Sequence, residues 1–494
     1  MKIEKISRPK LNIITTFLNQ IITTACGIVV PRILIASYGS EAYGISVSIT
    51  QFLSYISLLE SGIGGVARAQ LYGPLAKKDD YEVSMVYHAV KSFFQWVAVA
   101  FLAYSLVLGF TYSDIAHVTI FSRTYIFALV LVIGLSTLAK YMGGLVNLTL
   151  IMADQRQYVN NAISVLTTIA NTLSIVILVN LKSDLLWVKL GSSLIFVVRP
   201  LLYTLYVKKH YTLPKVGKNK AVLDQKWTGI GQHIAYFLHT NTDIVLLTIF
   251  ANARLIAVYS VYNLVISSIR AITESFSGGM EAAFGEMIAK GQLQKLQKTY
   301  RGYKSLLVSI TTVLFACTGI LIVPFVQLYT RGVTDADYVQ PMFALLLLMA
   351  EAINCMMLPC TSLPIAANRL KQTKWGAYGE AIINIGLSCG LIFWNPLLGV
   401  ALGTLVATIF RGVFYMVYSS RHILHMPTHR LLLHFVGTVS VLTGCILVGR
   451  LMIAHLTLKN YFWWALCGAG VFAAISIPTM LIYRLRTRNQ ESEM

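Results

Sequence analysis

Charged side chains are scarce in this chain of 494 residues. They account for 12% of the sequence, whereas soluble proteins average about 25%. The hydrophobic residues A, V, I, L, M, F, W, Y and C account for 56%, and a soluble protein of this composition would have too few polar groups to cover its surface. The balance excludes a soluble enzyme, a disordered chain and a secreted disulfide scaffold, and it favours an integral membrane protein.

Acidic residues are the scarcer charged class, with 20 Asp and Glu against 40 Lys and Arg. In a soluble protein the resulting net charge of +20 would suggest a nucleic-acid partner. In a membrane protein, however, the cytoplasmic loops are enriched in Lys and Arg. We therefore expect no nucleic-acid partner.

Motifs for catalysis and metal binding are also lacking. The seven cysteines lie in apolar stretches, where a cysteine usually serves as a small hydrophobic residue, so neither a disulfide framework nor a metal site is expected. The sequence has no G-x-x-x-x-G-K-[ST] loop for nucleotide binding. We therefore predict that the protein is not an enzyme, has no catalytic residue and needs no cofactor beyond a coupling ion.

What the chain has instead is a series of long apolar runs. A transmembrane helix needs about 20 apolar residues, and about fourteen runs of that length are bounded by charged or turn residues. We expect helices at residues 11–36, 43–66, 87–110, 124–150, 158–180, 185–207, 228–250, 256–281, 303–328, 341–365, 375–394, 397–419, 431–455 and 461–484. The strands of an outer-membrane barrel are only about 10 residues long, so the pattern predicts an all-α integral membrane protein.

Lys and Arg are distributed unevenly between the two sides of this arrangement. The loops on the side of the N-terminus hold 27 of them, and the loops on the opposite side hold 5. Cytoplasmic loops carry the excess of Lys and Arg. Because one missed helix would destroy this asymmetry, it supports the helix count and predicts that both termini are cytoplasmic.

A short pattern, E-S-x-x-G-G, occurs twice, at residues 60–65 and 274–279. Each copy lies near the cytoplasmic end of the second expected helix of its half, and transporters are often built from such repeats. We expect Glu60 and Glu274 to stabilise the bundles by pairing with Arg or Lys. The glycine pairs, which permit close approach or bending of helices, are Gly64, Gly65, Gly278 and Gly279.

The repeat divides the chain into two pseudo-symmetric six-helix bundles. The expected domains are an N-terminal bundle at residues 1–207, a cytoplasmic linker at 208–227, a C-terminal bundle at 228–420 and a final part at 421–494. The final part holds a loop, the two C-terminal helices and a cytoplasmic tail, outside the duplication.

Ionisable residues inside spans are costly in a bilayer and are therefore functional candidates. Arg199, Arg270 and Arg411 each lie about 14 residues into a helix that runs inward, roughly 21 Å deep at 1.5 Å per residue. Lys140 and Lys91 lie at a similar level. We expect these five cations to form a belt that binds a diphosphate, since Arg binds phosphate oxygens bidentately and Lys acts as a point charge. The alternative is that they extend to the cytoplasmic interface or form structural ion pairs.

Two carboxylates lie near mid-membrane, Asp243 and Glu351. Neither has an evident cation at its own depth. Asn263, at a similar depth in the next helix, is able to bond Asp243, and Asn354 lies one turn from Glu351. A buried carboxylate can take up a proton or bind Na⁺, so both are candidates for coupling transport to an ion. The alternative is a neutral, hydrogen-bonded structural carboxyl group.

The opening of the chain resembles a known family. Residues 31–34 (PRIL) close the first expected helix and residues 38–44 (YGSEAYG) open the second. This is similar to the start of the polysaccharide transport family, the Wzx-like lipid-linked oligosaccharide flippases. That family belongs to the superfamily that also contains multidrug and toxic compound extruders and lipid II flippases. The resemblance implies two six-helix bundles around a central cavity that opens alternately to each side of the plasma (inner) membrane.

The function implied by the resemblance is transfer of an undecaprenyl-diphosphate-linked oligosaccharide repeat unit, for surface polysaccharide biosynthesis. The implied partners are this substrate, membrane lipids and other polysaccharide assembly proteins. Three alternatives remain. A multidrug extruder would favour a more acidic cavity, a membrane-embedded polysaccharide polymerase or ligase would need catalytic groups on the outer face, and a lipid-bound scaffold would not transport at all.

Overall fold

The computed structural model describes residues 8–60, 63–214, 230–276, 279–453 and 460–492, and every regular element within these ranges is a helix. The predicted all-α class is therefore confirmed. The helices form two compact units. Unit 1 comprises Met1–Ile234 and Asn252–Ile256, and unit 2 comprises Ala235–Ala251 and Ala257–Met494. Most of the predicted linker at 208–227 lies outside the described residues.

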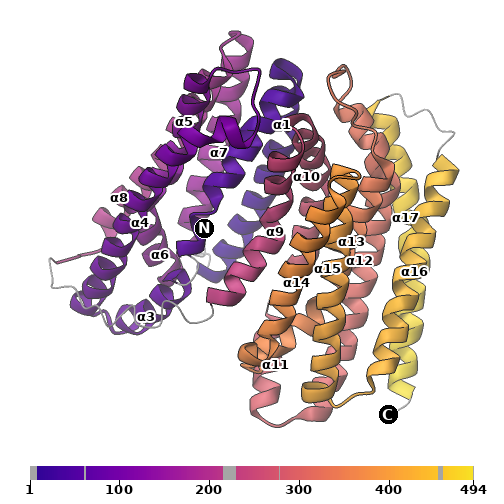
Figure 1. Cartoon of the computed structure of the whole chain (residues 1–494). Helices are drawn as coiled ribbons and strands as arrows, with labels where there is room; N and C mark the ends of the chain where they lie inside the picture. The colour runs from indigo at the N-terminus through magenta and orange to yellow at the C-terminus, as the bar shows by residue number, and fades with distance from the viewer. Residues whose placement is uncertain (1–7, 61–62, 215–229, 277–278, 454–459, 493–494) are drawn as a thin grey trace, which may run out of the picture. The chain divides into compact units, whose positions relative to one another are not determined.

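Unit 1 contains the helices of the first half of the chain (Figure 1). Its elements are α1 (Arg8–Ser54), α2 (Ser57–Glu60), α3 (Ile63–Lys77), α4 (Asp80–Ile115), α5 (Arg123–Ala139), the π-helical turn η1 (Lys140–Gly144), α6 (Leu145–Ala153), α7 (Gln157–Asn180) and α8 (Leu185–His210). Side chains of Asp79, Ser122 and Asp184 cap the first turns of α4, α5 and α8. These caps satisfy backbone N–H groups that have no partner inside the helix.

Helix α1 contains the first expected span and the first half of the second, which continues through α2 into α3. The part of α1 before Gly39 lies along α7. Asn12 donates to the carbonyl of Gln155, just before α7, at 2.9 Å, and Tyr38 donates to the carbonyl of Ser183, just after α7, at 2.6 Å. Gly39 has φ 82° and ψ 167°, a left-handed conformation that glycine adopts without steric cost. After it, Tyr104 of α4 donates to the carbonyl of Phe52 at 2.9 Å. The two parts of α1 therefore pack on different helices.

The second glycine of the YGSEAYG segment has a different role. A Cβ built on Gly44 would overlap the backbone carbonyl of Ala253, so a larger residue cannot occupy this position without a shift of the backbone. Close to this contact, Glu41 and Arg254 form an ion pair at 2.9 Å. The segment that carries the family resemblance thus supplies both a turn and a close contact.

Unit 2 contains the second half of the chain together with the two C-terminal helices. Its elements are α9 (Ile230–Phe250), α10 (Ala253–Ser275), α11 (Met280–Ala289), α12 (Leu293–Tyr329), α13 (Pro341–Ala366), α14 (Leu370–Leu391), α15 (Pro396–Ser419), the π-helical turn η3 (Ser420–Leu424), α16 (Thr428–Ile453) and α17 (Tyr461–Ser492). The first residues of α9 and α10 are assigned to unit 1. Arg450 of α16 donates to the carbonyl of Gly319 at 2.7 Å, and Trp464 of α17 donates to that of Leu321 at 3.2 Å. Both C-terminal helices are thereby packed on α12.

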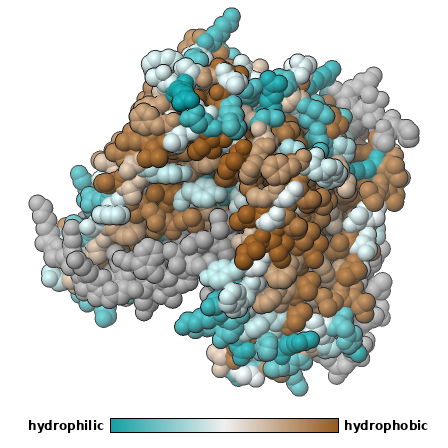
Figure 2. Space-filling view, viewed as in Figure 1, coloured by the Kyte–Doolittle hydropathy of each residue, from teal (hydrophilic) through white to brown (hydrophobic). Residues whose placement is uncertain are grey.

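The surface of the helices is apolar where a soluble protein would be polar. Trp96 and Phe110 on α4 are 74% and 70% exposed, as expected where acyl chains are the solvent. Figure 2 shows hydrophobic residues over the middle of the unit 2 helices and hydrophilic residues near their ends. Among the described residues, 11 helices are long and apolar enough to cross a membrane. The count is below the predicted number because α1 is counted once and neither α9 nor α14 qualifies over its full length. The chain is a multi-pass membrane protein.

Candidate functional site

Arg199 is a cation inside unit 1 whose partners are neutral. From α8, its Nε donates to the hydroxyl of Thr167 at 2.5 Å, and its Nη2 donates to the hydroxyl of Thr168 at 2.9 Å and the carbonyl of Ser164 at 3.3 Å. The guanidinium also lies over the ring of Phe196, 4.6 Å from its centroid. Among the described residues, no carboxylate neutralises it. These contacts fix the side chain and leave its charge available.

Lys140 lies nearby and is paired with an acid. It begins the π-helical turn η1, and its Nζ lies 3.2 Å from both carboxylate oxygens of Glu60 on α2. The hydroxyl of Tyr141 donates to the same carboxylate at 2.6 Å. The expected pairing of Glu60 with a cation is therefore confirmed.

One cavity of unit 1 brings these two cations together. Lys140 and Arg199 line a pocket of about 320 Å³, together with Tyr203 and Asn160. Tyr203 donates to the side-chain oxygen of Asn160 at 2.6 Å. No carboxylate is among the residues that line the pocket. Lys140 is paired with Glu60 outside the lining, so Arg199 supplies the uncompensated positive charge of the wall. Lys91 is half-buried on α4 and does not line this pocket.

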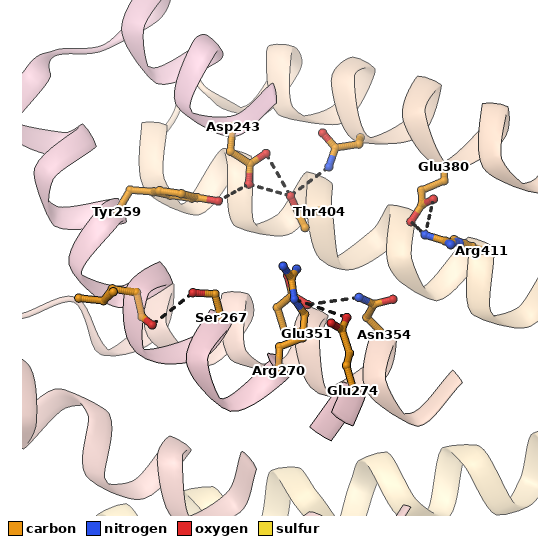
Figure 3. Close-up of polar contacts among 12 residues, drawn as sticks. Asp243, Tyr259, Ser267, Arg270, Glu274, Glu351, Asn354, Glu380, Thr404 and Arg411 are labelled. Carbon is orange, nitrogen blue, oxygen red and sulfur yellow. Dashed lines mark hydrogen bonds and ion pairs between the residues drawn. The ribbon is translucent and has the colours of Figure 1, made fainter. Parts of the chain in front are cut away.

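Arg270 of unit 2 differs from Arg199 because acids surround it (Figure 3). Its guanidinium lies 3.0 Å from Glu351 of α13 and 3.7 Å from Glu274, one turn further along α10. The expected pairing of Glu274 with a cation is confirmed. The expectation that Glu351 lacks a cation at its depth is wrong, because an Arg side chain is long enough to cover the difference in level between the two backbones. Asn354, one turn along α13, donates to Glu351 at 3.3 Å.

Arg411 of α15 is likewise paired, with an acid that the sequence reasoning did not single out. Its Nη1 lies 3.1 Å from the carboxylate of Glu380 on α14. The side chain of Glu380 is 1% exposed. One signal for it was present, since Glu380 and Asn384 lie one turn apart in an apolar helix. Both polar groups face α15 (Figure 3).

Asp243 of α9 is the most enclosed of the predicted site residues. Only 4% of the residue is exposed. Its carboxylate accepts bonds from the hydroxyls of Tyr259 at 2.9 Å and of Thr404 at 3.1 and 3.2 Å. Asn384 in turn donates to Thr404 at 3.0 Å. The expected bond from Asn263 is not made. Tyr259, one turn earlier on α10, has a side chain long enough to take its place.

These contacts form a buried polar network across α9, α10, α14 and α15 (Figure 3). Among the described residues, the carboxylate of Asp243 has hydroxyl partners and no cation. Such a group can hold a proton or bind a metal cation through oxygen ligands. The chemistry available around Asp243 is therefore that of a cation or proton site, whereas the pocket of unit 1 suits an anion.

The two copies of E-S-x-x-G-G occur at corresponding places in the two units. In each, the helix that carries the glutamate ends and a short helix follows, α3 after α2 and α11 after α10. Gly279 has φ 86° and directly precedes α11, so its backbone forms a bend at the start of that helix. A Cβ on Gly64 or Gly65 would meet nothing within 4 Å, so these two glycines do not permit a close helix contact. Gly278 lies outside the described residues.

An ion pair joins the second and fourth spans of each half. In unit 1 it is Glu60 with Lys140, and in unit 2 it is Arg270 with Glu351. The spans correspond in the repeat, but the paired residues lie about one turn apart from the corresponding positions, and the signs are reversed. This common placement supports the duplication that the short sequence pattern indicates.

The fold is shared with transport proteins of known structure. The lipid II flippase MurJ, in an inward closed conformation, matches 96% of this chain and 99% of its own, with TM-score 0.68 and 13% identity. An inward-facing MATE family multidrug resistance transporter of the MOP superfamily matches 81% of this chain and 95% of its own, with TM-score 0.58 and 12% identity. The MATE multidrug transporter DinF-BH matches 85% of this chain and 97% of its own, with TM-score 0.59 and 15% identity.

Sequence comparison alone does not detect this likeness. No protein-family model matches the chain, and no curated protein is significantly similar to it. At identities of 12–15% the likeness establishes the fold. The chain is therefore an all-helical, multi-pass membrane protein with the fold that lipid II flippase and the MATE transporters of the MOP superfamily share.

Proposed function

We propose that the protein is a flippase for a lipid-linked oligosaccharide. It carries an undecaprenyl-diphosphate-linked repeat unit across the plasma membrane by alternating access, for surface polysaccharide biosynthesis. Two observations support this proposal. The likeness to the lipid II flippase extends over 96% of the chain, against 81% and 85% for the two multidrug transporters. The opening segment resembles the polysaccharide transport family.

The observation that carries the proposal is the pocket of Lys140 and Arg199. A diphosphate offers several oxygens to a guanidinium, whose planar donors match them bidentately. Arg199 is oriented by three bonds to α7 but not neutralised. Its charge is therefore available to the diphosphate. Arg270 and Arg411 already have carboxylate partners, so we assign them a smaller part in binding, and Lys91 stays a candidate by depth alone.

A multidrug extruder is the second candidate function, and Asp243 is the observation that favours it. A buried carboxylate can recognise an organic cation, and multidrug transporters share this fold. The uncompensated cation in unit 1 favours the flippase, because a cationic drug would be repelled there.

The first test replaces Arg199 in cells that lack the gene. Arg199→Ala is expected to lower surface polysaccharide at least tenfold at equal protein level, since a charge-assisted bond to phosphate contributes about 1.5–3 kcal/mol. Arg199→Lys should keep part of the wild-type polysaccharide level, because lysine supplies the positive charge as a point charge without the planar donors. Arg123, which is 76% exposed and paired with Asp114, supplies the control variant Arg123→Ala, with wild-type polysaccharide. Wild-type polysaccharide in Arg199→Ala cells would overturn the assignment.

We also propose an energy source, orientation and partners for this flippase. Asp243 is the main candidate for coupling to H⁺ or Na⁺, and Glu351 is a weaker one because Arg270 already holds it. Both termini are cytoplasmic, as the excess of Lys and Arg on one side indicates. Membrane lipids surround the protein, and other polysaccharide assembly proteins supply and receive its substrate.

A further inference from the structure

We propose that a second pocket, at one end of unit 2, binds a phosphate group. The cavity has a volume of about 280 Å³. It lies where three connections meet, namely α11 to α12, α13 to α14 and α15 to α16. Its polar lining consists of Gln292, Arg369, His422 and His425, over an apolar floor that includes Ile288 and Leu296. The proposal does not depend on the transport function or on the pocket of unit 1.

The backbone shapes this pocket through tight turns. Each of the three connections has a residue in the left-handed region, Gly291 at φ 64°, Asn368 at φ 53° and His425 at φ 51°. A residue other than glycine is uncommon in this conformation. His425 follows directly after the π-helical turn η3, and such turns are frequent at functional sites. The irregular backbone brings His422 and His425 to the same cavity.

Arg369 is fixed in place without being neutralised. It precedes α14, and its Nη1 donates to the backbone carbonyl of His422 at 3.1 Å. This bond holds the arginine against η3. No carboxylate partner of Arg369 is found in the part of the chain that the structure describes. The ring of His422 packs against that of Tyr418, with centroids 4.9 Å apart.

The charge balance of the pocket favours an anion. Its lining contains one arginine, two histidines and no acid. Glu286, which precedes the lining residue Met287, is paired with Lys290 at 2.5 Å. Arginine donors match phosphate oxygens bidentately, and imidazole and amide groups add further donors. The apolar floor beside them suits the carbon skeleton of a phosphate ester.

Binding by the purified full-length chain tests the proposal. In an uncharged detergent, the chain is titrated with inorganic phosphate and, separately, with dihexanoyl phosphatidic acid, and dihexanoyl phosphatidylcholine serves as the lipid without net charge. We expect saturable calorimetric binding of at least one phosphate probe and none of phosphatidylcholine. Arg369→Gln should weaken it about tenfold, since a charged hydrogen-bonding group is lost. His425→Gln should weaken it about threefold.

The control variant is Arg421→Gln, because Arg421 lies exposed on η3 but does not line the pocket. It should bind within about twofold of wild type, as expected for an exposed, screened charge that does not line the pocket. Binding of phosphatidic acid alone identifies a lipid headgroup, and competition by inorganic phosphate identifies the free ion. The proposal is overturned if neither probe binds, or if Arg421→Gln loses as much affinity as His425→Gln. His425→Gln keeps the test valid should Arg369→Gln fail to fold.

Discussion

The three arginines inside the helices differ mainly in their neighbours. Arg199 bonds to hydroxyls and a carbonyl, whereas Arg270 and Arg411 bond to carboxylates. Sequence depth places all three at one level and cannot separate them, because the partners come from helices distant in the sequence. The structure thus separates the three predicted arginines into two kinds. Arg199 is held by neutral groups, whereas Arg270 and Arg411 are members of ion pairs.

This division predicts opposite phenotypes for two matched substitutions. Arg411→Gln should lower the free energy of unfolding by about 3 kcal/mol, because it removes one charge of a buried ion pair whose carboxylate, that of Glu380, is 1% exposed. Arg199→Gln should lower the free energy of unfolding less than Arg411→Gln does, and it should lower transport more. Thermal unfolding in detergent, alongside surface polysaccharide in cells, measures both. Equal destabilisation by the two variants would contradict the distinction.

At the scale of helices, most of the fold is readable from the sequence. The expected spans at 158–180 and 185–207 correspond to α7 at Gln157–Asn180 and α8 at Leu185–His210, because apolar runs in a bilayer are long and end at polar residues. Three features could not be predicted. They are the turn inside α1 at Gly39, the π-helical turn within the expected span 124–150, and the short helix after each E-S-x-x-G-G copy. Each depends on local packing that hydropathy does not encode.

The candidate site was predictable in part. Depth and cost of burial singled out Asp243, Glu351 and the intramembrane cations, and within the described residues the structure gives hydrogen-bond or ion-pair partners to all of them that are named here except Lys91. They did not identify Tyr259 or Thr404, because a Tyr or Thr in an apolar helix carries no distinct signal. Which side chains meet depends on the rotation of each helix about its axis, and one sequence does not fix that rotation.

Helix contacts make a further prediction at two glycines. Gly44→Ala should destabilise unit 1 by about 1–3 kcal/mol, as overpacking typically does, since the new Cβ would overlap the carbonyl of Ala253. Gly64→Ala is the matched control. It has open space around it and lies in α3, so it should be neutral or stabilise the protein by up to about 1 kcal/mol. Unfolding temperatures in detergent compare the two, and an unchanged Gly44→Ala protein would refute the close contact.

At the scale of the whole molecule, transport against a gradient needs an energy source. In vesicles, we expect a proton or sodium gradient to accelerate transport by the wild-type protein. The Asp243→Asn variant should transport at the same rate with and without the gradient. Its amide keeps the shape of the carboxyl group but cannot take up a proton or carry a negative charge. Asp114→Asn, in a side chain 59% exposed, is the control and should keep the acceleration. Identical wild-type rates in both conditions would remove the coupling role.

The reversed signs of the two inter-span ion pairs limit how the halves of the molecule can be recombined. Each pair is formed within its own half, with the acid on the second span in one and on the fourth span in the other. A chimera that exchanged the fourth spans would place Glu60 opposite Glu351 and Arg270 opposite Lys140. The fourth span of one half therefore cannot replace that of the other without bringing like charges together.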